Sequence, residues 1–282
     1  MTGGRRHGAT RPREWSRMLR DPLLPGVEVL QAHFLRYRYP PHWHDAVCVA
    51  VVGRGAAAFD CARRQYLAPA GSAFVIPAYE IHTGEPAAPD GLGYDVLYIT
   101  PDRMAGLLED TQATLGRPAT ADVVHRRTAV AGPLAGFHRT MAEPVAPLQR
   151  EHALLAGVVA VAREFSAVSG TQPATAPPEH RAVQRARDYL HAHPTEPVTL
   201  RALAEAAGLS MYRLARTFRA DVGMPPYAYQ LQLRVVEAKR LLAAGRSISR
   251  TALDCGFYDQ AHLTHQFKRY VGVTPGAYRR GS

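Results

Sequence analysis

The fold of this chain is decided by a stretch that occurs twice: Leu200-x3-Ala204-x3-Gly208-Leu209, then Leu214-x3-Phe218-Arg219, then Gly223-x2-Pro226-x2-Tyr229. The second copy is Ile248-x3-Ala252-x3-Gly256-Phe257, then Leu263-x3-Phe267-Lys268, then Gly272-x2-Pro275-x2-Tyr278. The copies are offset by 48 residues before their central turn and by 49 residues after it. So many matched positions at one offset indicate an internal repeat, which has to be recognised before a fold is assigned.

Each copy has the pattern of two short helices joined by a tight turn. Apolar residues three to four apart predict a helix over residues 199–207, and Gly208 stands where a residue with positive φ ends a helix. Ser210 has the chemistry of an N-cap for a second helix, which we expect from about Met211 to Asp221. In the second copy Asp259 takes the N-cap position. Two such helices form a helix-turn-helix.

The second helix of a helix-turn-helix enters the DNA major groove, so the residues opposite its buried stripe face the base edges. In the first copy these residues are Met211, Tyr212, Arg213, Ala215, Arg216 and Arg219. In the second copy they are Gln260, Ala261, His262, Thr264, His265 and Gln266. Arg can make two hydrogen bonds to guanine, and Gln can do the same to adenine. The alternative is a plain helical bundle with a polar surface, which the duplication disfavours.

The segment Pro226–Gly245 between the copies has the length of a connecting rod. Twenty helical residues at about 1.5 Å each span roughly 30 Å. Successive major grooves on one DNA face are about 34 Å apart. A rod of this length could place both reading helices on one site, or it could serve only to pack the two units together.

Residues from about 180 to 280 resemble the AraC/XylS-type transcription regulators. The most specific matches are Gly256-Phe257-x-Asp259-Gln260, Phe267-Lys268-Arg269, Gly272-Val273-Thr274-Pro275 and Arg234-x3-Ala238-Lys239-Arg240-Leu241-Leu242. The resemblance implies a seven-helix, two-unit domain that binds double-stranded promoter DNA, with RNA polymerase as a further partner. Ala261 departs from the family, which commonly has Ser there, so we expect the second unit to read sequence less strictly.

The net charge of +10 is unevenly distributed. Residues 178–282 carry +8 and residues 1–20 carry +5, whereas residues 21–177 carry −3. Positive charge therefore lies on the predicted DNA-binding region and on a basic arm, where it can neutralise phosphates. All but two of the basic residues are Arg, which reflects codon usage as well as function, so the regional asymmetry is the better evidence.

Two domains are the natural expectation for 282 residues. The chain has no apolar run long enough for a transmembrane helix, and its basic N-terminus has no apolar segment of a secretory signal. The three cysteines, Cys48, Cys61 and Cys255, show no metal-type spacing. We expect reduced structural thiols in a cytoplasmic protein.

The N-terminal half has short runs rich in β-branched and aromatic residues, separated by Pro and Gly turn signals. The expected strands are Val27–Tyr39, Ala46–Val52, Ala56–Cys61, Ser72–Ile76 and Tyr94–Thr100. Such spacing favours a sandwich or small barrel. Residues 20–100 are similar to the cupin-like barrel that many AraC-type regulators carry as an effector domain. The matching residues are Pro41-His42-Trp43-His44-Asp45, Gly53-x-Gly55 and Pro69-Ala70-Gly71 leading to Pro77-x4-His82.

His42, His44 and His82 are the candidate effector-binding residues, together with Tyr39. His42 and His44 share one strand face because side chains alternate along a strand. Three histidines suit a transition metal, but the Glu that cupin enzymes place after the His pair is missing here. Three interpretations therefore stay open: histidines that hydrogen-bond an effector, histidines that serve the fold, and a metal set. Tyr37, Trp43 and Tyr79 could add aromatic walls or belong to the core.

The sequence thus predicts a multidomain β plus all-α protein. We expect a flexible arm over residues 1–20, a cupin-like sensing and dimerisation domain over 21–168, a linker over 169–179 and the DNA-binding domain over 180–282. The barrel covers about 21–100 and helices about 101–168. The expected helices are Pro101–Leu115, Pro133–Ala142 and Leu148–Ala167, and the last is either a dimer seam or packed on its own barrel.

The predicted function is a sequence-specific DNA-binding transcription regulator controlled by a small-molecule effector in the barrel. We expect a homodimer without enzyme activity, cofactor or membrane association. One alternative is a metal-dependent cupin enzyme fused to a DNA-binding domain. Another is a dimeric regulator that senses no ligand.

Overall fold

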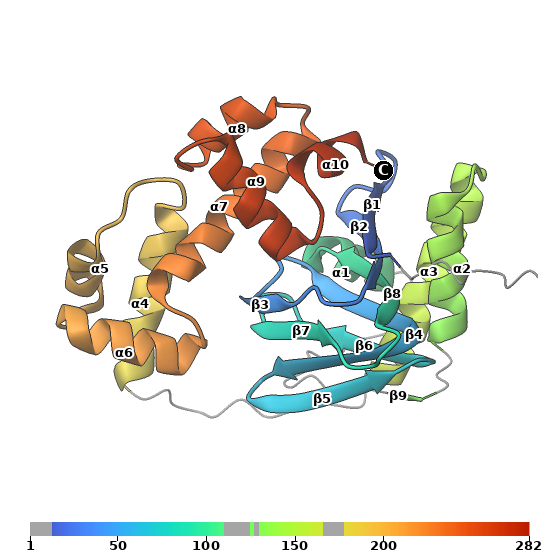
Figure 1. The fold of residues 1–282 in the computed structure, drawn as a ribbon, viewed down its shortest axis with the longest axis horizontal. Helices are drawn as coiled ribbons and strands as arrows, with labels where there is room; N and C mark the ends of the chain where they lie inside the picture. The colour runs from blue at the N-terminus through green and yellow to red at the C-terminus, as the bar shows by residue number, and fades with distance from the viewer. Residues whose placement is uncertain (1–12, 110–124, 127–129, 166–177, 282) are drawn as a thin grey trace, which may run out of the picture.

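The computed structural model describes residues 13–109, 125–126, 130–165 and 178–281. A curled antiparallel sheet with flanking helices forms the N-terminal part, and helices alone form the C-terminal part (Figure 1). The predicted fold class is therefore confirmed. The strands are β1 Trp15–Arg20, β2 Val27–Phe34, β3 Tyr39–His42, β4 Val47–Cys61, β5 Arg64–Pro69, β6 Ser72–Ile76, β7 His82–Pro86, β8 Leu92–Ile99 and β9 His125–Arg126. The helices are α1 Pro101–Glu109, α2 Ala131–Ala142, α3 Pro147–Phe165, α4 Pro178–Ala192, α5 Leu200–Ala207, α6 Met211–Val222, α7 Pro226–Ala243, α8 Ile248–Asp254, α9 Gln260–Val271 and α10 Pro275–Arg280.

The long strand β4 lies at the centre of the sheet and pairs with four other strands. Its first part pairs with β8 and β6, and its second part pairs with β5 and β7. The register with β8 shifts between Val52 and Arg54, which is a bulge that bends the strand. Gly55 has φ +70°, and a Cβ on it would lie 1.8 Å from the carbonyl oxygen of Gly91, so no larger residue fits. The sheet can therefore curl at this point and form a concave face.

This bend corrects one prediction. Ala46–Val52 and Ala56–Cys61 were expected as two strands, with a turn at residues 53–55 between them, but they belong to the single strand β4. Glycine inside a strand pattern marks a bulge as readily as a turn. The strands β5 (RQYLAP) and β7 (HTGEP) were missed because neither contains a run of β-branched and aromatic residues.

The predicted flexible arm is also corrected. Residues 1–12 lie outside the described part, but Trp15–Arg20 forms β1, which pairs antiparallel with β2 from Trp15↔His33 to Arg20↔Glu28. Met18 and Leu19 are buried. The arginines in this strand suggested a solvated arm, whereas the sheet edge supplies backbone partners that local composition does not reveal.

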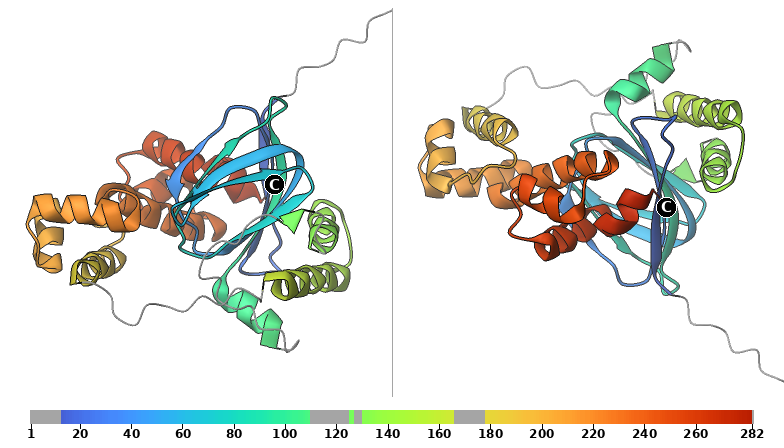
Figure 2. Two further views of the ribbon diagram at one scale, coloured as in Figure 1. Left: turned by 90° about the horizontal axis from the view of Figure 1, so that it is seen from below. Right: turned by 90° about the horizontal axis from the view of Figure 1, so that it is seen from above.

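Two helices pack on one face of the curled sheet. α2 and α3 cover the convex face, where Phe137 and Val158 join Val29, Val49 and Leu97 in one buried cluster (Figure 2).

Two predictions fall partly outside the described residues. The helix predicted over Pro101–Leu115 is present as α1 up to Glu109, and the remainder lies outside the described residues. The linker predicted over residues 169–179 also lies outside the described residues up to residue 177, and its last two residues belong to α4, which begins at Pro178.

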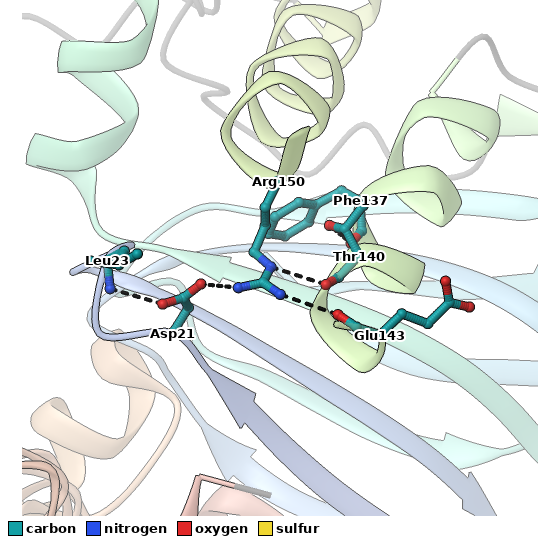
Figure 3. Close-up of polar contacts among 6 residues, drawn as sticks. All are labelled: Asp21, Leu23, Phe137, Thr140, Glu143 and Arg150. Carbon is teal, nitrogen blue, oxygen red and sulfur yellow. Dashed lines mark hydrogen bonds and ion pairs between the residues drawn. The ribbon is translucent and has the colours of Figure 1, made fainter. Parts of the chain in front are cut away.

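Arg150 fixes the helical layer to the sheet (Figure 3). Its guanidinium donates to the carbonyl oxygens of Thr140 and Glu143 at the end of α2 and pairs with the Asp21 carboxylate just after β1. The backbone N–H of Leu23 and the Arg150 guanidinium hold the pKa of Asp21 below its usual value. Because this ion pair is largely buried, it ties α2 and α3 to one edge of the sheet.

The C-terminal part contains seven helices within the described residues 178–281. α4, α5 and α6 gather at one end of α7, and α8, α9 and α10 gather at its other end (Figure 1). Phe218 is fully buried in the first group and packs against Tyr229, while Phe267 is fully buried in the second and packs against Tyr278. The repeat in the sequence is thus a repeat in the structure.

Candidate DNA-reading helices and effector pocket

The first helix-turn-helix unit has the local geometry that its sequence predicts. The Thr199 and Ser210 hydroxyls accept hydrogen bonds from the backbone N–H groups of Ala202 and Arg213, which caps α5 and α6. Gly208 ends α5 in the left-handed conformation, with φ 69°. These caps satisfy backbone donors that a helix end otherwise leaves unpaired.

The predicted reading residues of α6 lie on the surface. Tyr212 is 78% exposed and Met211 is 42% exposed. Arg213, Arg216 and Arg219 are exposed, and Ala215 is half-buried. All six predicted residues are therefore accessible on one helix, although contact with DNA stays a prediction.

The second unit repeats this geometry with a longer turn. The Asp259 carboxylate accepts a hydrogen bond from the His262 backbone N–H at 2.7 Å and caps α9. Gln260, Ala261 and His265 are exposed, whereas His262 and Thr264 are half-buried. The sequence reasoning missed a residue here, since Tyr258 directly before the cap is 88% exposed. Its place in the turn beside the cap was the available signal.

Both reading helices touch the sheet domain, but at different places: the end of α6 accepts a hydrogen bond from the Arg63 guanidinium at the Ala220 carbonyl oxygen, whereas α9 borders the sheet with its reading face. One groove has Tyr37, Arg38, Tyr39 and Pro40 on one wall and residues of α9 on the other. The α9 residues are Gln260, Ala261, Thr264, His265, Lys268 and Arg269. Most of the predicted reading residues of the second unit thus share a groove with β3 and the segment before it.

Polar contacts join the C-terminal helices to the sheet around this groove. The Tyr37 hydroxyl donates to the Lys268 carbonyl oxygen, and the Ser16 hydroxyl donates to the Gly272 carbonyl oxygen at 2.8 Å. On α7, the Lys239 ammonium lies 2.9 Å from the Glu28 carboxylate, and Glu28 and Asp45 raise the pKa of Lys239 against the opposing effect of its burial. These contacts fix the second unit against β1–β3.

The concave face of the sheet holds a pocket that contains all four predicted effector residues. Tyr39, His42, His44 and His82 line it. His42 lies at the end of β3 opposite His82 at the start of β7, and His44 follows two residues later. The imidazole centroids are 4.2 Å apart for His42 and His82, 4.8 Å for His42 and His44, and 5.1 Å for His44 and His82.

Burial sets the charge state of this pocket. Loss of solvent lowers the pKa of His42 and His44 well below the usual value and lowers the pKa of His82 to about 4. The neighbouring imidazoles add to this effect for His42 and His44. Three neutral histidines therefore face the pocket at neutral pH, and they could hold a metal ion or hydrogen-bond an effector.

Sequence reasoning missed part of the pocket wall. Tyr94 and Tyr98 on β8 and Cys48 on β4 also line it. The two tyrosines are four residues apart on one strand and so lie on the same face. The alternation of side chains along a strand could therefore have identified them from the sequence. Trp43 lies elsewhere, against Tyr229 of α7 at a centroid distance of 5.5 Å. It belongs to the contact between the sheet and the C-terminal helices.

The three thiols are unsuited to attack. Cys48, Cys61 and Cys255 are buried and free. Burial raises the pKa of Cys61 and of Cys255 to about 12, so almost no reactive thiolate forms at neutral pH. This agrees with the expected structural role.

Residues 24–158 match the family profile of the AraC-like ligand binding domain, and residues 203–281 match that of a helix-turn-helix domain. The chain belongs to the AraC family of transcription regulators. It is a DNA-binding transcription regulator with a ligand-binding N-terminal domain, as the sequence predicted. None of its described helices has both the length and the apolar character of a membrane span.

This member of the AraC family has relatives along most of its length. It is 27% identical to the HTH-type transcriptional regulator YbfI of Bacillus subtilis over 243 residues, which is 86% of this chain and 87% of YbfI. It is 34% identical to the activator RhaS of Escherichia fergusonii over 94 residues, about a third of each chain. Apo ToxT of Vibrio cholerae shares its fold, with a TM-score of 0.58 and 13% identity over 90% of this chain and 97% of ToxT.

Proposed function

We propose that both reading helices of this AraC-family regulator contact one promoter site, and that ligand binding in the sheet pocket changes how the second helix is presented. The observation that carries the proposal is the pair of matched, capped helices at the two ends of α7. α7 has 18 residues, about 27 Å of helix, which is close to the roughly 34 Å between successive major grooves.

The proposed base-reading residues are those predicted on α6 and α9, with Arg216 and Gln260 as the residues best suited to guanine and adenine. Tyr258 extends this set by its exposure at the turn of the second unit. Residues 178–282 carry a charge of +8, which favours phosphate contacts and makes affinity depend steeply on salt.

The proposed link between pocket and DNA runs through Tyr39. Its ring stacks on His42 at a centroid distance of 5.1 Å. Its hydroxyl oxygen reaches the end of α9, where a Cβ added to Gly272 would lie only 2.1 Å from it. A ligand that moved Tyr39 would therefore move a side chain that packs directly on the second reading helix.

A population shift describes this coupling. The groove beside α9 leaves limited space for DNA while β3 forms its other wall, so we infer that the second unit binds DNA best when it has moved from the sheet. An effector changes DNA affinity only by the difference between its affinities for the two arrangements.

The test is DNA binding of the full chain to a site selected from random double-stranded DNA, by fluorescence anisotropy at several salt concentrations. We expect specific binding that weakens when Arg216 or Gln260 is replaced by Ala, and that changes with at least one compound from a panel of small effectors. The exposed Arg163→Ala on α3 removes the same charge far from the reading helices and serves as the control. Curves that are identical for all compounds would contradict the sensing part of the proposal, and unchanged binding of both variants would contradict the reading part.

We further propose a cytoplasmic homodimer that uses the outer face of α3. Leu154, Val158 and Val161 of this helix pack on the protein's own core. Ala162 packs there too, whereas Leu148 remains 77% exposed and Leu155 is half-buried, so the first half of α3 is the part available for a seam. Sedimentation of Leu148→Glu tests this, since an unchanged dimer would exclude that seam. RNA polymerase is the proposed partner at the promoter, and we propose no catalytic reaction.

A further inference from the structure

Three histidines from two segments of the N-terminal chain lie close together. One ring nitrogen from each of His42, His44 and His82 lies within 4.8 Å of the corresponding atoms of the other two. A tetrahedral ion with metal–nitrogen bonds of about 2.0–2.1 Å holds its ligand atoms about 3.3 Å apart. Side-chain rotations that close at most about 1.5 Å would therefore bring the three nitrogens to coordination distance.

Two of the rings are already oriented as metal ligands are. The Nδ1 atom of His42 lies 2.9 Å from the Pro40 carbonyl oxygen, and the Nδ1 atom of His82 lies 2.9 Å from the Glu80 carbonyl oxygen. A carbonyl oxygen can only accept, so Nδ1 carries the proton in both rings and the lone pair is on Nε2. Histidines that bind metal are held in this way, because the second nitrogen donates to a backbone carbonyl or carboxylate that fixes tautomer and angle.

The surroundings select the kind of ion. The enclosed space beside the histidines has room for only a few water molecules, about 40 Å³. Glu85 also lines the pocket, but its carboxylate pairs with the Arg38 guanidinium. Imidazole nitrogens without a free carboxylate suit zinc, iron(II), cobalt or nickel, whereas magnesium and calcium require oxygen ligands.

We propose that His42, His44 and His82 bind one divalent transition-metal ion, with the remaining coordination positions open to the pocket. The ion would join β3 to β7, since His42 and His82 lie on those strands. Water or an oxygen atom of an effector would complete its coordination on the side lined by Tyr94 and Tyr98. This site is independent of the proposed DNA contacts, so each proposal can fail without the other.

The experiment is cobalt titration of the purified full chain after removal of metal with a chelator. We expect about one Co²⁺ per chain, a visible d–d absorption of a cobalt–imidazole complex and a rise in Tm. His44→Ala should lose all three signals. His33→Ala is the matched control, because His33 is a buried histidine of the same sheet outside the cluster, and it should keep them.

Two further variants protect the test against loss of folding. His42→Gln and His82→Asn retain polar side chains of similar size, and circular dichroism checks their secondary structure. Loss of cobalt binding in these folded variants supports the site. Retention of cobalt in all cluster variants would assign it to surface histidines and overturn the proposal, as would binding well below one ion per chain by the unmodified protein.

Discussion

The two helix-turn-helix units share one sequence pattern and one internal geometry but have different surroundings. The predicted reading residues of α6 lie at the surface, whereas most of those of α9 line a groove whose other wall is formed by residues 37–40. The Tyr37 hydroxyl bonds to the backbone of α9, and Tyr39 packs on the end of that helix. The two copies of one DNA-binding unit therefore differ in their contacts with the N-terminal domain, which is why we expect an effector to act on the second copy.

The largest effects are expected from core substitutions at equivalent positions of the two helix-turn-helix units, Phe218→Ala and Phe267→Ala, which test whether the two cores are equivalent. Both rings are fully buried, so each variant should lose about 3–5 kcal/mol of unfolding free energy through lost burial and a cavity. Urea unfolding followed by circular dichroism measures this. Leu67→Ala, at a 59% exposed position on β5, should change stability by less than about 0.5 kcal/mol. A large loss in one Phe variant only would show that the two cores are not equivalent.

A second matched pair, Gly223→Ala and Gly272→Ala, tests the difference between the two units, which is that Tyr39 packs on the end of α9. Both glycines end a reading helix with positive φ, which costs an alanine about 1–2 kcal/mol. At Gly223 the new Cβ meets only Ile81 at 3.6 Å, but at Gly272 it would lie 2.1 Å from the Tyr39 oxygen. We expect the second variant to lose about 1–3 kcal/mol more than the first because Tyr39 has to move. Equal losses in thermal unfolding would mean that Tyr39 does not press on α9.

A smaller effect is expected from a base-reading residue. Arg216→Ala should weaken binding to the specific site by about 1–3 kcal/mol and relax the sequence preference at one position. Competition with random DNA separates this from a phosphate contact, whose loss weakens all sequences alike. An equal effect on specific and random DNA would show that Arg216 does not read a base.

The smallest expected effect concerns the contact that holds the second unit. Tyr37→Phe removes the hydrogen bond to the Lys268 carbonyl oxygen, which is worth about 0.5–1.5 kcal/mol. If that contact restrains α9, affinity for promoter DNA should increase by roughly twofold to tenfold, as measured by anisotropy. Tyr66→Phe on β5 is the control and should leave affinity unchanged. Weaker DNA binding by Tyr37→Phe would contradict the inferred restraint.

The helical part was predicted well from the sequence because its signals are local. Helix periodicity and the caps at Thr199, Ser210 and Asp259 depend on residues within one turn, and the structure contains all three caps. The strands were predicted less well because pairing is long-range. The register of β1 with β2, and the continuity of β4 through its bulge, depend on neighbours that residue patterns do not identify.

The candidate sites likewise differ in how far local sequence patterns predict them. The structure brings together the three histidines that the sequence suggested, but β3 ends at His42, so His44 reaches the cluster from the loop after the strand and not by strand alternation. The groove between α9 and β3 joins residues more than 200 positions apart, and no local pattern reports such a contact. It could be found only once both domains were placed in one structure.

The central claim is that both reading helices bind one duplex, and hydroxyl-radical footprinting of the full chain on a selected promoter site tests it most directly. We expect protection over two adjacent major grooves on one face of the DNA, about one helical turn apart. Arg216→Ala should weaken protection in one groove, and Gln260→Ala should weaken it in the other. Protection confined to a single groove, or loss of protection in the same groove in both variants, would show that the two reading helices do not bind adjacent grooves of one duplex.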